Sequence, residues 1–359
     1  MKGLTTILML AALRLGAAEN WTNLKSDEQL VFYPTVAQRV PGQTNLWRAE
    51  IRGCVFEIEK RRLLLAAFRE TVELKTEEMT SAQSVMFNER ARLFLVDHER
   101  GKKVFIRCGT NEFFVGKSGA DGRFSGAITF PDSTPPTFTA VLKPDDTRQF
   151  GGQLFPLEAE GISVISDIDD TIKITEVRDK AATLRNTFLR QFQPVPGMVE
   201  FYQTLARSNG AAFHYISASP WQLYEPLATF VTSNSFPTGT FELKQFRWKD
   251  RSFFSLFANP EKYKPGVIAP LLKQFPQRKF ILIGDSGERD PEIYGALARK
   301  FPEQIIRVYI RDVTNESADA ERYQKAFRDV LRAKWQIFRT PAELPPSFPP
   351  ASGMLSQPK

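Results

Sequence analysis

The sequence predicts an α/β fold in which a small β-rich, sandwich-like domain precedes a doubly wound parallel sheet. Helical patterns, such as 198–208 and 292–301, alternate with short and nearly continuous apolar runs, at 161–166, 211–217, 279–284 and 305–310. Buried strands that alternate with amphipathic helices are typical of a parallel sheet covered on both faces. The region before them differs, because apolar and polar residues roughly alternate there between turns.

The β-rich domain is predicted over residues 24–155. Gly and Pro separate its strand-like segments, which are 46–59, 91–97, 102–109 and 122–131. Residues 60–86 have a more helical pattern. The second domain is predicted over residues 160–340, and we expect its active site beyond the carboxyl ends of its strands.

Both ends of the chain are predicted to lie outside these domains. Residues 1–18 are similar to a secretory signal, with Lys2 before an apolar stretch that is too short to span a bilayer, and small residues up to Ala18. We therefore expect an exported protein, periplasmic or secreted. Residues 341–359 are rich in Pro and Ser and are expected to form a disordered tail.

Composition narrows the classes of function. The net charge of +7 favours an acidic partner, which could be anionic lipid, nucleic acid or a phosphorylated substrate. Two cysteines without zinc-finger spacing or a following Arg exclude zinc fingers and cysteine phosphatases, and two histidines argue against histidine phosphatases. Because export implies an oxidising compartment, Cys54 and Cys108 are predicted to form a disulfide.

The first motif that carries chemistry is Asp167-Ile168-Asp169-Asp170-Thr171, which directly follows an apolar run. Asp167 and Asp169 are two residues apart, so an extended backbone points both side chains the same way. One carboxylate can attack phosphorus, and the other can protonate the leaving oxygen and later activate water. By itself, the motif is equally consistent with an acidic turn that caps the next helix.

Two further motifs offer groups that bind phosphate. Ser217 ends the second apolar run, where its hydroxyl can hold a phosphoryl oxygen, whereas Ser219 better fits a helix N-cap before Pro220. Lys264 lies just before an amphipathic helix predicted at 267–275, and its ammonium can neutralise the transferring phosphoryl group. Lys262 is a competing candidate.

The last motif begins at Gly284, at the end of the third apolar run. Asp285 can reach a metal from this strand end, and Asp290 can ligate the metal or fix its waters. Oxygen ligands and the absence of a nearby His or Cys favour Mg²⁺. We expect Mg²⁺ to lie between Asp167, Asp285 and the backbone carbonyl of Asp169.

The order of these four motifs is that of the haloacid-dehalogenase-like phosphatases. More specifically, the chain resembles the App1 family of phosphatidate phosphatases in the segments 166–175, 194–198, 217–224 and 282–294. The resemblance implies a Mg²⁺-dependent enzyme that hydrolyses phosphatidate to diacylglycerol and phosphate through an aspartyl-phosphate. It also implies roles for individual residues. The nucleophile would be Asp167, the acid/base Asp169, the phosphate-binding residues Thr171, Ser217 and Lys264, and the metal-binding residues Asp167, Asp169, Asp285 and Asp290.

The predicted substrate is a phospholipid met at a membrane surface, with peripheral membrane contact and no nucleic-acid partner. Segment 241–264 interleaves aromatic residues with cations, including Arg247 and Trp248, as suits a membrane interface. The stretch between Thr171 and Pro194 is too short for a large cap domain, so an open site is expected. Two alternatives are a phosphatase for another phosphate ester and a non-catalytic module that binds anionic ligands.

Overall fold

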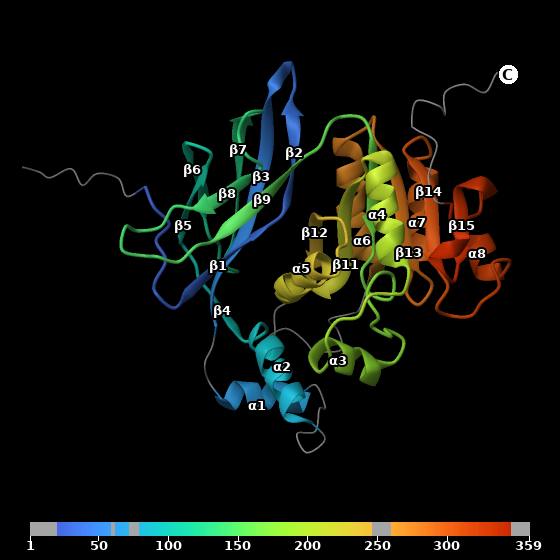
Figure 1. Cartoon of the computed structure of the whole chain (residues 1–359), viewed down its shortest axis with the longest axis horizontal. Coiled ribbons are helices and arrows are strands. Elements are labelled where there is room, and N and C mark those ends of the chain that lie inside the picture. Colours follow the sequence, from blue (N-terminus) through green and yellow to red (C-terminus); the bar gives the residue numbers. More distant parts are fainter. Residues whose placement is uncertain (1–19, 59–61, 72–78, 246–259, 346–359) are drawn as a thin grey trace, which may run out of the picture.

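The computed structural model describes residues 20–58, 62–71, 79–245 and 260–345, which form two domains side by side (Figure 1). The predicted signal, residues 1–18, lies outside these ranges, as does the tail from residue 346 onward. Within the tail, the described residues include a short 3₁₀ turn, Pro341–Glu343. No helix in these four ranges is long and apolar enough to cross a membrane.

The second domain is built on a six-stranded sheet in the order β12-β11-β10-β13-β14-β15, and every neighbouring pair is parallel. The strands are β10 (Ile162–Ser166), β11 (Ala212–Pro220), β12 (Gly239–Lys244), β13 (Lys279–Asp285), β14 (Ile305–Arg311) and β15 (Trp335–Phe338). The chain runs from the central β10 to one edge, returns to β13 beside β10, and then continues to the other edge. The strand order therefore reverses at β10, and ligands of such sheets bind beyond the carboxyl ends of the strands at this point.

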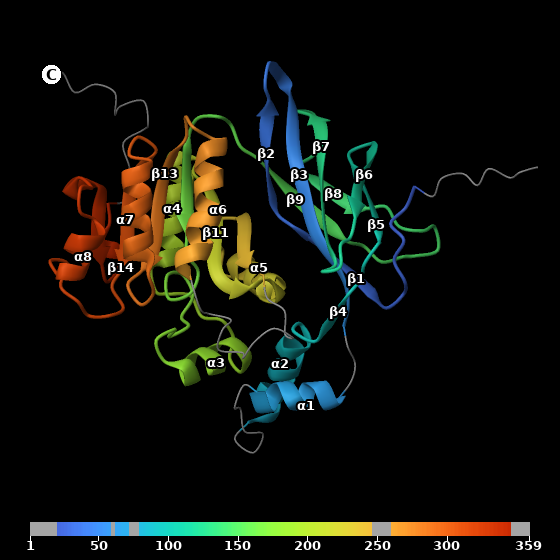
Figure 2. The ribbon, with the colours of Figure 1, turned by 180° about the vertical axis from the view of Figure 1, so that it is seen from behind.

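Helices cover both faces of this sheet (Figures 1 and 2). One face packs against α4 (Met198–Asn209) and α5 (Tyr224–Ser233), and the other against α6 (Pro260–Gln274) and α7 (Asp290–Lys300). The domain also contains α3 (Lys180–Phe188) and α8 (Glu321–Ala326). The predicted doubly wound parallel sheet is confirmed, because apolar residues fill both faces of its central strands.

The first domain is β-rich, as expected, and its strands join into one nine-stranded sheet. These are β1 (Glu28–Tyr33), β2 (Thr35–Val40), β3 (Gln43–Ile58), β4 (Val96–His98), β5 (Lys103–Cys108), β6 (Asn111–Lys117), β7 (Arg123–Pro131), β8 (Thr137–Ala140) and β9 (Gly151–Pro156). The long β3 pairs along both of its edges, with β1 and β2 on one and β4 and β7 on the other. The sheet thereby curls around a single apolar core.

The strand predicted at 91–97 is largely wrong. Two helices, α1 (Arg62–Thr71) and α2 (Ser81–Arg92), separate β3 from β4, and the short β4 overlaps only the end of the predicted strand. Phe87, Ala91, Phe94 and Leu95 are buried together at intervals of three and four residues, which is the period of a helix face. Alternation over a few residues concealed this longer period.

The helices α1 and α2 pack against the second domain. Phe68 and Phe94 place their rings 5.6 Å from that of Phe188 on α3. The guanidinium of Arg90 donates hydrogen bonds to the backbone carbonyls of Thr187 and Arg190. An insertion from the β-rich domain thus lies, together with α3, at the end of the parallel sheet where β10 finishes (Figure 1).

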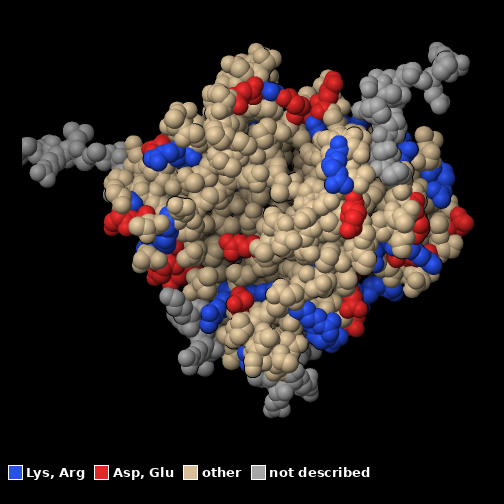
Figure 3. Space-filling model, viewed as in Figure 1, with Lys and Arg blue, Asp and Glu red and all other residues tan. Residues whose placement is uncertain are grey.

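A second contact joins β3 to the edge strand β12. The guanidinium of Arg52 pairs with the carboxylate of Glu242 at 2.5 Å, and the buried Trp221 packs with Cys54 and Phe56 of β3. A hollow separates the domains on the face shown in Figure 3, where most charged side chains lie toward the periphery. The two domains therefore meet along only part of their facing surfaces.

The predicted Cys54–Cys108 disulfide is wrong, because both cysteines are free. Cys54 is buried on β3 beside Trp221, whereas Cys108 on β5 is buried in the core of the curled sheet. Burial raises the pKa of Cys54 to about 12 and also raises that of Cys108. Both thiols are thus protonated and shielded at neutral pH, where thiolate is the reactive form.

We predict that a reducing agent leaves the Tm unchanged, since no disulfide restrains the unfolded chain. Alkylation of the two thiols should be slow in the native protein and complete after denaturation. Mass spectrometry of non-reduced peptides provides the control, and a linked Cys54–Cys108 peptide pair would contradict this prediction.

Candidate active site

The predicted nucleophile, Asp167, lies immediately after β10 and is buried, with 1% of its surface exposed. Its backbone N–H donates to the carbonyl of Ile283 on β13, which fixes the residue beside the neighbouring strand end. One carboxylate oxygen, Oδ1, accepts a hydrogen bond from Lys264, whereas Oδ2 is buried without a hydrogen-bond partner. Asp167 therefore has one neutralised oxygen and one that lacks a partner.

Lys264, and not Lys262, reaches the carboxylates. Its fully buried ammonium lies 2.8 Å from Asp167 Oδ1, 2.5 Å from Asp290 Oδ1 and 3.5 Å from Glu288 Oε2. Lys262 is exposed. The expectation that Lys264 precedes its helix is wrong, because α6 already begins at Pro260. Its place inside the helix holds the side chain rigidly toward the sheet edge.

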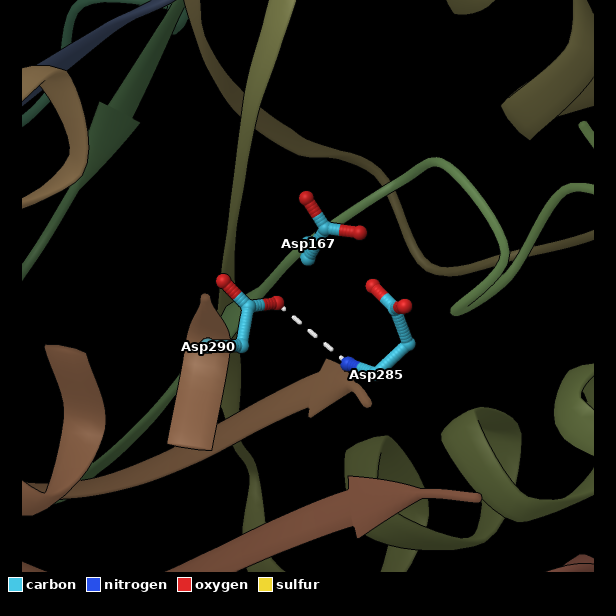
Figure 4. Close-up of side chains that lie close together, drawn as sticks. All are labelled: Asp167, Asp285 and Asp290. Carbon is cyan, nitrogen blue, oxygen red and sulfur yellow. Dashed lines mark hydrogen bonds between the residues drawn. The ribbon is translucent and has the colours of Figure 1, made fainter. Parts of the chain in front are cut away.

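Asp167, Asp285 and Asp290 form a buried cluster in which one oxygen from each lies within 4.8 Å of the others. Figure 4 shows the three carboxylates converging from separate parts of the chain. The backbone N–H of Asp285 donates to Asp290 Oδ2 at 3.3 Å. Gly284 permits this approach, because a Cβ atom there would lie 2.2 Å from that same oxygen.

The electrostatics of this cluster fit a divalent cation. Burial raises the pKa of both Asp167 and Asp285, and neighbouring carboxylates raise them further, while Lys264 opposes the shift. Asp285 Oδ2, like Asp167 Oδ2, is buried without a hydrogen-bond partner. A hard cation that prefers oxygen ligands would satisfy these atoms and offset the repulsion.

Asp169 has a different environment and its side chain lies outside this cluster. Its Oδ1 accepts from Thr175 and pairs with Lys173, both at 2.8 Å. Its Oδ2 accepts from the hydroxyls of Ser217 and Ser219 at 2.8 and 2.7 Å. Burial alone would raise the pKa of Asp169, but Lys173 and these hydroxyls outweigh burial and lower it. Asp169 is thus held as an anion.

The predicted phosphate-binding hydroxyls lie around the same strand ends. Ser217 contacts Asp169, and the buried Thr171 hydroxyl has no hydrogen-bond partner. The prediction that Ser219 caps a helix is wrong, because Pro220 precedes the short 3₁₀ segment Trp221–Leu223 and no side chain caps it. Ser219 instead donates to Asp169, which adds a second hydroxyl to this part of the site.

Comparison with known proteins identifies the domain that holds these residues. Residues 162–312 match the family model described as "Phosphatidate phosphatase APP1, catalytic domain". This region is similar to the catalytic domain of the APP1 family. The match contains all seven predicted site residues and confirms the resemblance derived from the motifs.

Two curated relatives match the chain over about half of its length. Over 188 residues it is 37% identical to "Phosphatidate phosphatase APP1" of Saccharomyces cerevisiae, covering 51% of this chain and 31% of the relative. Over 164 residues it is 34% identical to an uncharacterized protein of Schizosaccharomyces pombe, covering 45% of this chain and 26% of the relative. The chain therefore spans about a third or less of the length of these APP1-like relatives.

Sequence reasoning missed three residues that contact the site or the segments around it. Lys173 pairs with Asp169, Glu288 approaches Lys264, and Arg322 donates to the backbone carbonyls of Ser286 and Glu288. Lys173 follows Asp169 and Thr171 at the same two-residue spacing, which was a signal for it. Nothing in the sequence separates Arg322 from other surface arginines, because its contacts are long-range.

The expectation of an open site is wrong for the catalytic side chains, since Asp167, Lys264 and Asp285 are buried. The short stretch after Thr171 still forms α3, and α1 and α2 join it from the other domain. Of the aromatic and basic segment, Phe241 belongs to the core. Arg247 and Trp248 lie outside the described residues.

We predict that Lys264→Met lowers the free energy of unfolding by about 3–5 kcal/mol, because it leaves buried carboxylates without their cation. The matched control is Lys262→Met, two residues away on the same helix and exposed, which should change stability little. Urea unfolding at pH 7 measures both. Equal losses in the two variants would show that Lys264 does not neutralise the cluster.

Proposed function

We propose that the chain is a Mg²⁺-dependent phosphatidate phosphatase with a haloacid-dehalogenase-like catalytic domain, acting through an aspartyl-phosphate on Asp167. The observation that carries this proposal is the pairing of buried Asp167 with Lys264 at 2.8 Å, beside a cluster of metal-ligand type, within an APP1-type domain. A buried carboxylate with a fixed cation is poised for nucleophilic attack on a dianion.

In the first step, an oxygen of Asp167 attacks phosphorus, and the bond from phosphorus to the lipid oxygen breaks. Asp169, which takes up a proton from solvent when the substrate binds, gives this proton to that oxygen, so diacylglycerol leaves as an alcohol. In the second step, Asp169 takes a proton from water, which attacks phosphorus and releases inorganic phosphate and free Asp167. Lys264 neutralises charge that develops next to Asp167 throughout.

The hydroxyls around Asp169 would adjust its proton affinity. Phosphoryl oxygens compete for the hydroxyls of Ser217 and Ser219, which in the free protein both donate to Asp169. Each hydroxyl that turns to the phosphoryl group removes one donor from the Asp169 carboxylate and so favours its protonation. Thr171, whose buried hydroxyl has no hydrogen-bond partner, would donate to the phosphoryl group as well.

Asp167, Asp285 and Asp290 would hold the Mg²⁺ through their carboxylates, with the backbone carbonyl of Asp169 as a further ligand. The cation would supply positive charge to the phosphoryl oxygens and to the crowded carboxylates. Its presence is supported by the two buried carboxylate oxygens that have no hydrogen-bond partner.

A second substrate class is favoured by the burial of the catalytic side chains. Buried carboxylates suit a small soluble phosphate ester as well as a lipid headgroup, so the same chemistry could serve either. A substrate panel of phosphatidate, lysophosphatidate and soluble monoesters distinguishes the two. Phosphatidate should give the highest kcat/KM if the substrate is a lipid.

We predict that Asp167→Asn reduces turnover of phosphatidate by roughly a thousandfold or more, because the amide keeps the shape but is not nucleophilic. The exposed Asp319 offers a matched control, and Asp319→Asn should retain full activity. Release of inorganic phosphate measures both. Substantial activity in Asp167→Asn would rule out the proposed nucleophile.

Magnesium is predicted to stabilise the fold as well as support turnover. Mg²⁺ at 100 times its Kd should add about 2.7 kcal/mol, seen as a rise in Tm, and EDTA should reverse the rise and abolish turnover. Asp285→Asn should lose the Tm response. A chelated enzyme with full activity would contradict the predicted metal.

A further inference from the structure

A cavity of about 540 Å³ lies between the two domains, and none of the catalytic carboxylates lines it. Strands β1, β3, β6 and β7 form one wall, and β12 with the start of α5 forms the other. This interdomain cleft has a size that suits a small ligand.

Two donors in the interdomain cleft lack an acceptor. Among the described residues, no carboxylate pairs with the guanidinium of Arg123, whose recorded side-chain contact is the ring of Trp221 at 6.0 Å. The hydroxyl of Tyr33 is buried without a hydrogen-bond partner. Both groups line the same cavity, where burial raises the pKa of Tyr33 and the guanidinium of Arg123 opposes that rise. Arg123 is only half-buried, but a buried hydroxyl normally has a partner, so Tyr33 indicates a missing acceptor beside the Arg123 guanidinium.

The remaining charges do not supply that acceptor. Glu242 is already paired with Arg52, and Glu50 is exposed. Lys117, also exposed, adds a third cation to the lining. The interdomain cleft therefore offers positive charge to a ligand, next to donors that are partly desolvated.

Aromatic rings line the part of the cleft next to these donors. The ring of Tyr224 lies 5.5 Å from those of both Tyr33 and Phe241, and Trp221 lies 6.4 Å from Tyr33. These rings present an apolar wall beside Arg123. A ligand that satisfies both parts has an anionic group and an apolar body.

We propose that the interdomain cleft is a second, non-catalytic binding site for an amphiphilic anion. Arg123 and Tyr33 bind the anionic group, and the rings of Tyr224 and Phe241 contact the apolar body. The anion is the carboxylate of a fatty acid or the phosphate of a single-chain lipid, since both offer several oxygen acceptors on one apolar chain.

The site is placed to communicate with catalysis. Trp221 follows the catalytic-edge residue Ser219 by two positions. Arg52 and Arg123 both act electrostatically on Tyr263, the residue before Lys264. An occupant of the interdomain cleft would therefore contact the segment that follows Ser219, and its charge would add to those that act on Tyr263.

The test is isothermal titration calorimetry of Asp167→Asn protein, which removes hydrolysis, with laurate and with dodecyl phosphate as probes. We expect at least one of the two probes to bind with a stoichiometry of one per chain, at the interdomain cleft. Arg123→Gln and Tyr33→Phe should each weaken it roughly tenfold, as for loss of a hydrogen bond to a charged group. Arg107→Gln, at an exposed position of β5 in the same domain, is the matched control and should bind normally.

Two further measurements test whether the variants are folded and which kind of anion binds. Tyr33→Phe should keep or raise the Tm, because its hydroxyl makes no hydrogen bond in the free protein. Tighter binding of laurate identifies a fatty acid, and tighter binding of dodecyl phosphate a lipid phosphate. Inorganic phosphate has the anionic group without an apolar chain, and octyl glucoside has the apolar chain without a charge. Both should bind the interdomain cleft weakly.

The inference is overturned if neither probe binds, or if Arg123→Gln and Tyr33→Phe bind both probes as well as Arg107→Gln. It does not depend on the proposed phosphatase. Cleft binding without hydrolysis of any ester by the wild-type protein would reject the function and keep the site, and the reverse result would keep only the function.

Discussion

The buried ammonium of Lys264 is the interaction on which the catalytic edge depends. Four carboxylates, those of Asp167, Asp285, Glu288 and Asp290, gather around the ends of β10 and β13, and bringing them together without a cation would cost several kcal/mol each. Lys264 supplies one positive charge from α6. The negative charge that remains supports the proposal that this edge holds Mg²⁺.

Two lysines divide the site into two environments. Lys264 neutralises Asp167 among other carboxylates, and the pKa of Asp167 is still raised by burial. Lys173 and three hydroxyls surround Asp169, and its pKa is lowered despite burial. Carboxylates only two residues apart thus differ in protonation behaviour. The proposed roles need a cation beside Asp167 to favour its ionised form, and a phosphoryl group that draws the hydroxyls away from Asp169 to favour its protonation.

The β-rich domain contributes to the surroundings of the catalytic edge. Its inserted helices α1 and α2 pack on α3 through Phe68, Phe94 and Phe188, and its strands line one wall of the interdomain cleft. The pairing of Arg52 with Glu242 joins β3 to the edge of the parallel sheet. The surroundings of the catalytic edge are therefore shared between two separately built cores.

The sequence by itself determined the parallel sheet and the residues at its carboxyl edge, because buried strands and strand-end motifs are local patterns. Only the tertiary structure chose Lys264 over Lys262, since both lie on one helix and differ in the direction they face. The tertiary structure also shows that Ser219 donates a hydrogen bond to Asp169 and does not cap a helix, and that Cys54 and Cys108 lie in different clusters of buried residues. Burial and long-range contacts decide these points, and neither can be inferred from the spacing of residues along the chain.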